Sequence, residues 1–415
     1  MAGARSDGWN AFRHRDLRLF CIARFCANLS SAMQNVAVGW FVYELTHSAW
    51  DLGLTGLFTF LPMLVFALIT GHVADTYDRR LIVTVSNLLT AAVSAALLIY
   101  SLLGYTSVNP IFVLMILIGT GRAFGNPAYK ALLPNLVPRE DFANAVAWSS
   151  SFEQFANTAG PAIGGLLYFF GAQTVFGVAC ALYLVASVAM FMISARPEPL
   201  KKEKPSFSTI TAGLRHIYAH KVLLGSISLD MVAVCVGGVT ALLPIFSDAL
   251  NAGPWGVGFL RSAQAIGSLA MASVLTRYPV RRGAGPKMMW AVAAYGAAIT
   301  TFGLSNNIVL SIFALFMVGA SDQVSVFVRH TIVQTDTPDH MRGRVSAVNV
   351  IFVGASGSLG EFESGALATL IGPFYAVIFG GIAAMAFAGL WSQLFPALRA
   401  RDNLLPPEPA KTKPA

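Results

Sequence analysis

The sequence is poor in charge. Only 12% of its 415 residues are Asp, Glu, Lys or Arg, and 55% are hydrophobic, whereas an average soluble domain has about 25% charged residues. Too few charged residues are present to give a folded core a surface compatible with water, which excludes an ordinary soluble protein. The hydrophobic residues occur in blocks, each long enough to cross a bilayer as a helix of about 20 residues.

Cysteine is scarce, and the motifs of common enzymes are missing. The four cysteines, Cys21, Cys26, Cys180 and Cys235, lie in hydrophobic blocks without paired spacing, which is typical of small buried residues rather than of a disulfide or metal framework. The sequence contains no GxxxxGK[ST], HExxH, CxxC or GxSxG. The seven histidines do not cluster at ligand spacings. We therefore expect no enzyme activity, no metal, no cofactor and no use of ATP.

The hydrophobic blocks predict about twelve helices separated mostly by short turns. The expected spans are residues 17–43, 51–74, 81–103, 109–132, 143–168, 172–195, 222–247, 255–277, 288–305, 309–333, 345–371 and 373–395. The longer separation between residues 195 and 222 begins ARPEPLKKEKPSFS and continues as an amphipathic surface segment. These features predict an all-α membrane protein.

Lysine and arginine occur in every second separator, which predicts the orientation because basic loops stay in the cytoplasm. The basic separators carry Arg79, Arg80, Arg139, Arg196, Lys201, Lys202, Lys204, Arg215, Lys221, Arg277, Arg281, Arg282, Lys287, Arg342 and Arg344. Both termini are basic as well, so we expect both in the cytoplasm. The net charge of +8 then reflects loops beside anionic lipid rather than binding to nucleic acid.

The two halves of the chain resemble each other. At an offset of 200 residues, Gly160 corresponds to Gly360 and Gly165 to Gly365. The repeat predicts two pseudo-symmetric six-helix bundles in the same orientation. The expected division is a cytoplasmic N-terminal segment 1–16, a first bundle 17–195, a cytoplasmic linker 196–221, a second bundle 222–395 and a cytoplasmic tail 396–415.

Charged and polar residues recur inside the hydrophobic blocks at spacings that put them on one face of a helix. These stripes are Arg24, Asn28, Ser31 and Asn35; Arg122, Asn126 and Lys130; Glu153 and Asn157; Arg261, Gln264 and Ser268; and Asp322, Ser325 and Arg329. A lone Ser or Asn usually hydrogen-bonds to a neighbouring helix. Charges in at least five helices cannot all face lipid, because each costs several kcal/mol in hydrocarbon. We therefore expect a water-accessible cavity between the halves, with these candidates for binding substrate: Arg24, Asn28, Arg122, Asn126, Asn157 and Asp230.

The carboxylates inside the blocks are candidates for exchanging a coupling proton. Glu153 is the first candidate because it lies near mid-depth on a polar stripe. An equally good interpretation is a fixed salt bridge from Glu153 to Arg24 or Arg122. The further candidates are Asp322, Glu361 and Glu363.

Two short motifs carry a resemblance to a known family. The stretch GHVADTYDRR between the second and third blocks is similar to the loop signature G-x-x-x-D-x-x-x-R-R/K of the major facilitator superfamily, at Gly71, Asp75, Arg79 and Arg80. The signature usually has glycine directly before the first arginine, where this chain has Asp78. The resemblance implies that this cluster acts as a gate between the halves; anchoring by positive charge alone would leave Asp75 unexplained.

The stretch AGPAIGG resembles a helix signature associated with exporters of that superfamily, at Gly160, Pro161, Gly164 and Gly165. Small residues four positions apart permit close helix packing. The run QTDTPDHMRGRVSAVNVIFVGASGSLGEFESG resembles a bacterial subgroup of drug and siderophore exporters. The resemblance covers roughly residues 12–395 and implies the twelve-helix major facilitator fold.

These observations lead to one interpretation of function. We expect a secondary active transporter, a proton-coupled exporter of a drug-like or siderophore-like small molecule that works by alternating access, as a monomer, in a bacterial inner membrane. Its partners would be the substrate, protons and the bilayer. The alternatives are an importer of a metabolite with the same fold, and a membrane receptor or scaffold that transports nothing.

Overall fold

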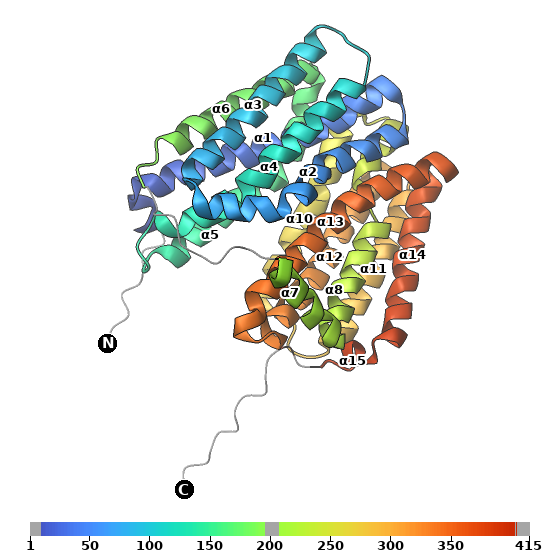
Figure 1. The fold of residues 1–415 in the computed structure, drawn as a ribbon. Coiled ribbons are helices and arrows are strands. Elements are labelled where there is room, and N and C mark those ends of the chain that lie inside the picture. Colours follow the sequence, from blue (N-terminus) through green and yellow to red (C-terminus); the bar gives the residue numbers. More distant parts are fainter. Residues whose placement is uncertain (1–9, 196–206, 403, 405–415) are drawn as a thin grey trace. The chain divides into compact units, whose positions relative to one another are not determined.

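A computed structural model describes residues 10–195, 207–402 and 404. The expected cytoplasmic segment 1–16, the linker 196–221 and the tail 396–415 therefore lie partly outside the described residues. The α-helices are α1 Arg15–Thr46, α2 Ala49–Thr76, α3 Arg79–Leu102, α4 Asn109–Leu132, α5 Phe142–Leu167, α6 Ala172–Phe191, α7 Phe207–Ala219, α8 Lys221–Val236, α9 Leu243–Ala249, α10 Gly253–Arg277, α11 Ala284–Leu304, α12 Ile308–Asp336, α13 Asp339–Ile371, α14 Pro373–Leu394 and α15 Pro396–Arg399. Within this part of the chain there is no strand, which confirms the all-α prediction (Figure 1).

Two of the predicted spans differ in detail from the helices of the structure, although Lys221–Ala249 is still one segment long and apolar enough to cross a membrane. The span 222–247 is not continuous: α8 ends at Val236, a short 3₁₀ turn follows at Thr240–Leu242, and α9 begins at Leu243. Gly237 caps α8, and paired glycines weaken a helix at this point. The span 345–371 begins earlier, at Asp339, directly after Pro338. The first turns of this helix are polar, so hydrophobic blocks alone do not indicate where it starts.

The described residues contain seven segments that are long and apolar enough to cross a membrane by themselves. They are Ala49–Phe66, Arg79–Leu102, Asn109–Asn135, Ala172–Phe191, Lys221–Ala249, Ile308–Asp336 and Pro373–Leu394. Among the long helices outside this set, α1 and α5 carry the polar stripes that hold the first unit's charges. Their lower hydropathy is therefore a consequence of the same residues that make them candidates for function.

The chain divides into two compact units. The first contains residues 1–205 together with Pro244–Ser262, and the second contains Ser206–Leu243 and the residues from Ala263 onward. In the first unit, α1 packs against α5 and α6, α3 against α4 and α6, and α2 against α4. Hydrophobic residues of these helices form its core, with Phe20, Leu132 and Met190 fully buried.

The second unit repeats four of these five pairings. Helix α8 packs against α13 and α14, and α11 packs against α12 and α14. The amphipathic helix α7 lies on α13 and α8, where a Cβ on Gly213 would come within 2.8 Å of the Arg344 carbonyl oxygen. The matched set of helix contacts is the internal repeat that the glycine spacing indicated in the sequence.

The glycines of the AGPAIGG stretch determine how closely α5 approaches its neighbours. A Cβ on Gly164 would lie 2.8 Å from the backbone of Met33 in α1, and a Cβ on Gly160 would lie 2.5 Å from the Cβ of Ala32. On another face, a Cβ on Gly165 would lie 2.8 Å from the Pro254 carbonyl oxygen of α10. Larger side chains cannot occupy these positions without moving backbone, so the small residues hold α5 beside the charged face of α1.

Candidate functional site: a polar cavity in the first unit

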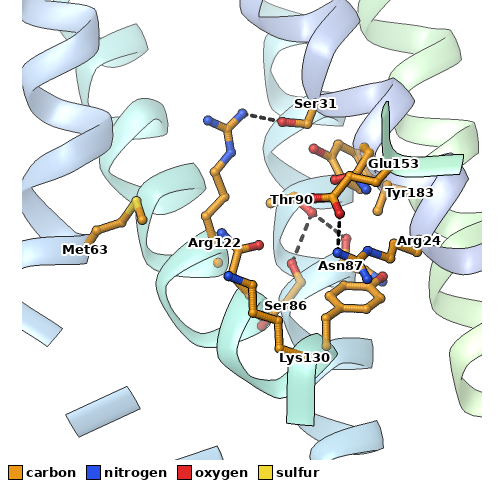
Figure 2. A pocket seen from close by; sticks show the side chains of 16 residues that line it. Arg24, Ser31, Met63, Ser86, Asn87, Thr90, Arg122, Lys130, Glu153 and Tyr183 are labelled. Carbon is orange, nitrogen blue, oxygen red and sulfur yellow. Dashed lines mark hydrogen bonds and ion pairs between the residues drawn. The ribbon is translucent and has the colours of Figure 1, made fainter. Parts of the chain in front are cut away.

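The first unit contains an open cavity of about 390 Å³, which is within the size range of small-molecule sites. Helices α1 to α6 all contribute to its wall. The lining residues are Arg24, Ala27, Asn28, Ser31, Met63, Ser86, Asn87, Thr90, Gly121, Arg122, Gly125, Asn126, Tyr129, Lys130, Glu153 and Tyr183 (Figure 2). Polar side chains thus surround a space inside a bundle whose composition is otherwise hydrophobic.

Helical spacing brings these side chains to the cavity. Arg24, Asn28 and Ser31 of α1 follow one another at four and three residues, and they line the same wall. On α4, glycines lie beside polar or charged residues along the face that lines the cavity. Gly125 allows α3 to approach closely, because a Cβ added to Gly125 would lie 3.3 Å from the Cβ of Ser86. Lys130 ends this face.

Glu153 forms an ion pair with Arg24, and Arg24 Nη1 also donates to Ser149 Oγ at 2.7 Å. The side chain of Arg24 is 13% exposed and that of Glu153 is 38% exposed. Of the two partners expected for a salt bridge from Glu153, the structure has Arg24. The more exposed carboxylate faces the cavity, as Figure 2 shows.

Arg122 is held by neutral groups. Its Nη2 donates to Ser31 Oγ at 2.7 Å and to Asn35 Oδ1 at 2.8 Å. Its Nε is buried without a hydrogen-bond partner, and no ion pair of Arg122 or of Lys130 occurs in the described part of the chain. The lining therefore contains three cationic side chains and a single carboxylate. Such an excess of positive charge in a partly desolvated site attracts anions.

Helix α3 supplies a wall of the cavity that the sequence analysis missed. Ser86, Asn87 and Thr90 line it, and Asn87 Nδ2 donates to the hydroxyl of Tyr129 at 2.9 Å. The sequence does contain a signal, because these residues and Ser94 place polar groups at positions 86, 87, 90 and 94 of a hydrophobic block. Neutral residues of this kind are usually explained by interhelical hydrogen bonds, and Ser94 does form one, to Gln34 Oε1 at 3.2 Å.

The other candidate residues lie elsewhere. Asn157 is exposed on α5 and does not line the cavity. Asp230 and Asp322 belong to the second unit, on α8 and α12, and line a cavity of about 10 Å³. Glu361 and Glu363 are on α13, and the buried Oε2 of Glu363 has no hydrogen-bond partner within the described residues.

Comparison with known proteins decides the family. The chain matches the family described as "Transmembrane secretion effector" over residues 6–410. It belongs to this family, within the major facilitator superfamily.

Individual proteins that are similar to this chain are consistent with that assignment. Proteins named "Enterobactin exporter EntS" from Escherichia coli and Shigella boydii are 27% identical to it over 338 residues, covering 81% of each chain. A bacterial homolog of the human lysosomal transporter Spinster, in an inward-facing and unoccupied conformation, matches with a TM-score of 0.71 at 14% identity over 96% of this chain and 99% of that one. The nucleoside transporter NupG matches with a TM-score of 0.72 at 13% identity over 92% and 99%. At such identities the structural likenesses establish the fold, which is that of major facilitator transporters.

The chain is therefore a multi-pass membrane protein and a secondary transporter, not an enzyme. The prediction of the major facilitator fold from the two motifs is confirmed.

The arginines of the GHVADTYDRR stretch hold helix ends of the first unit together. Arg79 is 4% exposed; its Nε donates to the Ala74 carbonyl oxygen at 3.0 Å, and its Nη1 to that of Ala131 at 3.2 Å. Arg80 Nη1 donates to the Ile193 carbonyl oxygen at 2.7 Å. These contacts join the cytoplasmic-side ends of α2, α3, α4 and α6 in the predicted orientation. Gly71 and Asp75 lie within α2, and the side chain of Asp75 is outside the described part.

The departure from the superfamily signature at Asp78 has a structural role. Asp78 is the N-cap residue of α3, and its Oδ1 accepts a hydrogen bond from the backbone N–H of Arg80 at 2.9 Å. Aspartate is among the best residues for this position, because it satisfies an N–H that the first turn of a helix leaves free. The chain thus begins α3 with a cap where the superfamily signature has glycine.

Proposed function

We propose that this transporter exports a small anionic molecule of the siderophore type from the cytoplasm and is driven by proton entry. The observation that supports the proposal is the charge of the cavity, where Arg24, Arg122 and Lys130 face a single carboxylate. Arg122 and Lys130 have no carboxylate partner of their own in the described structure, so both are available to an anion. Export of this class of compound agrees with the name of the enterobactin exporters that the chain resembles.

Arg24 and Arg122 would bind the substrate differently. Arg24 already has a carboxylate partner, so an anion must share it with Glu153. Arg122 is fixed by Ser31 and Asn35 without loss of its charge. A guanidinium held in place by neutral acceptors loses little freedom when it binds, which favours a strong, directional contact. Asn28 and Asn126 add neutral hydrogen-bonding groups on the same walls.

Glu153 is a candidate for exchanging the coupling proton, but the effect of its protonation on the charge of the cavity favours a different role. A proton on Glu153 would release Arg24 and leave the cavity more positive, so an anion would bind more tightly to the protonated protein. An exporter that exchanges protons for an anion needs the opposite relation, in which proton and substrate do not bind together. We propose that Glu153 adjusts the charge of the cavity, and that the coupling proton is carried by one of the other carboxylates.

The remaining features form part of the same proposal. Substrate access would alternate between the two sides of a bacterial inner membrane, with both termini in the cytoplasm and one chain sufficient for transport. The cluster of Gly71, Asp75, Arg79 and Arg80 would act in the cytoplasmic gate, and Gly160, Pro161, Gly164 and Gly165 would keep α5 closely packed. Reporter enzymes fused to each terminus test this orientation. Reporter activity on the outer side of the membrane would show that the terminus is not in the cytoplasm.

Transport into everted membrane vesicles tests the function. With an acidified lumen, we expect wild-type vesicles to accumulate iron-free enterobactin, because protons leave the lumen as substrate enters it. Arg122→Gln should reduce the initial rate at least about tenfold, as expected for loss of a charged hydrogen bond of about 1.5–3 kcal/mol. Arg139→Gln removes an exposed cation outside the cavity and is the matched control, with an expected rate near that of wild type.

Two results would contradict the proposal. Accumulation that requires the reverse gradient would identify an importer. No accumulation of enterobactin or of other anionic siderophores under any gradient would favour a receptor or scaffold.

A further inference from the structure

The second unit contains a buried ion pair, Asp230 with Arg329, to which the proposed function assigns no role. Asp230 Oδ2 of α8 lies 3.2 Å from Arg329 Nε of α12. Ser325 Oγ donates to the other carboxylate oxygen, Oδ1, at 2.9 Å, and Arg329 Nη1 donates to Asn349 Oδ1 of α13 at 2.7 Å. The four residues are between 1% and 5% exposed. The pair therefore connects three helices in a region without access to bulk water.

A second carboxylate lies beside this pair. Asp322 precedes Ser325 by three residues and Arg329 by seven on α12, so the three share one helix face. Asp322 and Asp230 line the same cavity of about 10 Å³, which has room for about one water molecule. Asp322 has no ion pair or side-chain hydrogen bond among the described residues.

The surroundings of Asp322 contain one cation for two carboxylates. The charged groups near it are Asp230 and Arg329. Helix α11 presents the neutral hydroxyl of Tyr295, which donates to the Gly237 carbonyl oxygen at 3.2 Å, and α13 presents the neutral Asn349. Helix α14 carries no charged residue along Pro373–Leu394. With both carboxylates ionised, the cluster would have an uncompensated negative charge in a medium of low dielectric, which is strongly unfavourable.

One proton removes this charge, and the contacts indicate where it goes. Asp230 already forms an ion pair with Arg329 and accepts a hydrogen bond from Ser325, whereas Asp322 has neither contact among the described residues. We propose that Asp322 binds the coupling proton of this transporter, with Asp230 and Arg329 as the fixed ion pair that positions it. Proton and substrate then bind to different units, since the polar cavity belongs to the first and Asp322 to the second. This inference rests on the proposed proton-coupled transport.

Infrared spectroscopy of the purified, full-length protein in lipid nanodiscs tests the proton site without any substrate. At neutral pH we expect the carbonyl band of a protonated carboxylic acid in wild type, and its loss in Asp322→Asn. Asp230→Asn should remove the same band, because Asp322 then ionises beside Arg329. Glu153→Gln is the control and should keep it. Retention of the band in Asp322→Asn, or its absence from wild type, would overturn the proposal.

Two further measurements separate the proton site from the transport function. Asp322→Glu keeps a carboxylic acid and should shift the band in frequency, which decides the matter if Asp322→Asn does not fold. In everted vesicles, Asp322→Asn should lose gradient-driven accumulation of enterobactin while retaining exchange of internal for external enterobactin. Gradient-driven accumulation by Asp322→Asn would overturn the assignment of the proton to Asp322. If wild-type protein shows the infrared band but transports nothing, only the proposed function is overturned.

Discussion

At the scale of single residues, the sequence indicated which charges line the cavity but did not fix how they pair. Arg24, Arg122 and Glu153 stood out because they interrupt hydrophobic blocks, and all three line the cavity. For Glu153 the sequence left two possible partners, Arg24 and Arg122, because Arg24 and Glu153 are 129 positions apart and helical spacing alone does not choose between them. Arg329 lies in a stripe with Asp322, yet its ion pair is with Asp230 on another helix.

The ion pair of Arg24 with Glu153 predicts the direction in which substrate affinity changes when Glu153 is replaced. A salt bridge with only a structural role would predict no gain in affinity. Glu153→Gln removes the carboxylate that competes for Arg24, so an anion gains a second free guanidinium. We expect the Kd for iron-free enterobactin, measured by isothermal titration on purified protein, to fall several-fold, consistent with about 1 kcal/mol from one more charged contact.

Arg24→Gln provides the opposite change and should raise the Kd. Asn157→Asp adds a carboxylate on the same helix outside the cavity and should leave it nearly unchanged. A weaker affinity in Glu153→Gln, with the protein still folded, would show that Glu153 contacts the substrate or supports the site instead.

At the scale of helices, hydrophobic blocks located most elements to within a few residues, because crossing a bilayer imposes a length and a composition. They failed where the chain is helical but polar, as at the start of α13, and where a hydrophobic block is interrupted, as between Val236 and Leu243. The wall formed by α3 was missed for a related reason: hydroxyl and amide groups serve equally well to join helices and to line a cavity.

Close packing of α5 on α1 gives a prediction about stability. In Gly164→Val, the new side chain would begin 2.8 Å from the backbone of Met33, so α1 and α5 must separate. Overpacking of this kind costs about 1–3 kcal/mol, and we expect a lower midpoint of thermal unfolding in detergent together with slower transport.

Gly389→Ala is the matched control for this prediction. Gly389 lies in α14 with no atom within 4 Å of a new Cβ. Replacing a helical glycine by alanine there should leave stability unchanged or raise it by about 0.5–1 kcal/mol. Equal stability of Gly164→Val and wild type would show that α1 and α5 are not constrained by this contact.

At the scale of the whole molecule, composition and the internal repeat predict two bundles of membrane helices, and the resemblance of the motifs to the superfamily predicts its fold. The repeat is visible as the same helix pairings in each unit, although few residues match between the halves. What the sequence could not indicate is that the units differ in chemistry. The first contains a cation-rich cavity of about 390 Å³, and the second contains a buried cluster with an excess of carboxylate around a cavity of about 10 Å³. Equivalent helices thus hold what we propose to be the substrate in one unit and the proton in the other.

The central claim is that the cation-rich cavity is where the exported anion binds, and protection of a cysteine from alkylation tests it most directly. Asn126→Cys would be introduced into a protein whose four native cysteines, all free thiols, are replaced by serine or alanine. Saturating iron-free enterobactin should slow the reaction of Asn126→Cys with a water-soluble maleimide at least about tenfold. The exposed loop position in Ser107→Cys should react equally fast with and without the compound. If Asn126→Cys reacts at the same rate in both conditions, while titration shows that enterobactin is bound, the substrate site lies elsewhere and the account is wrong.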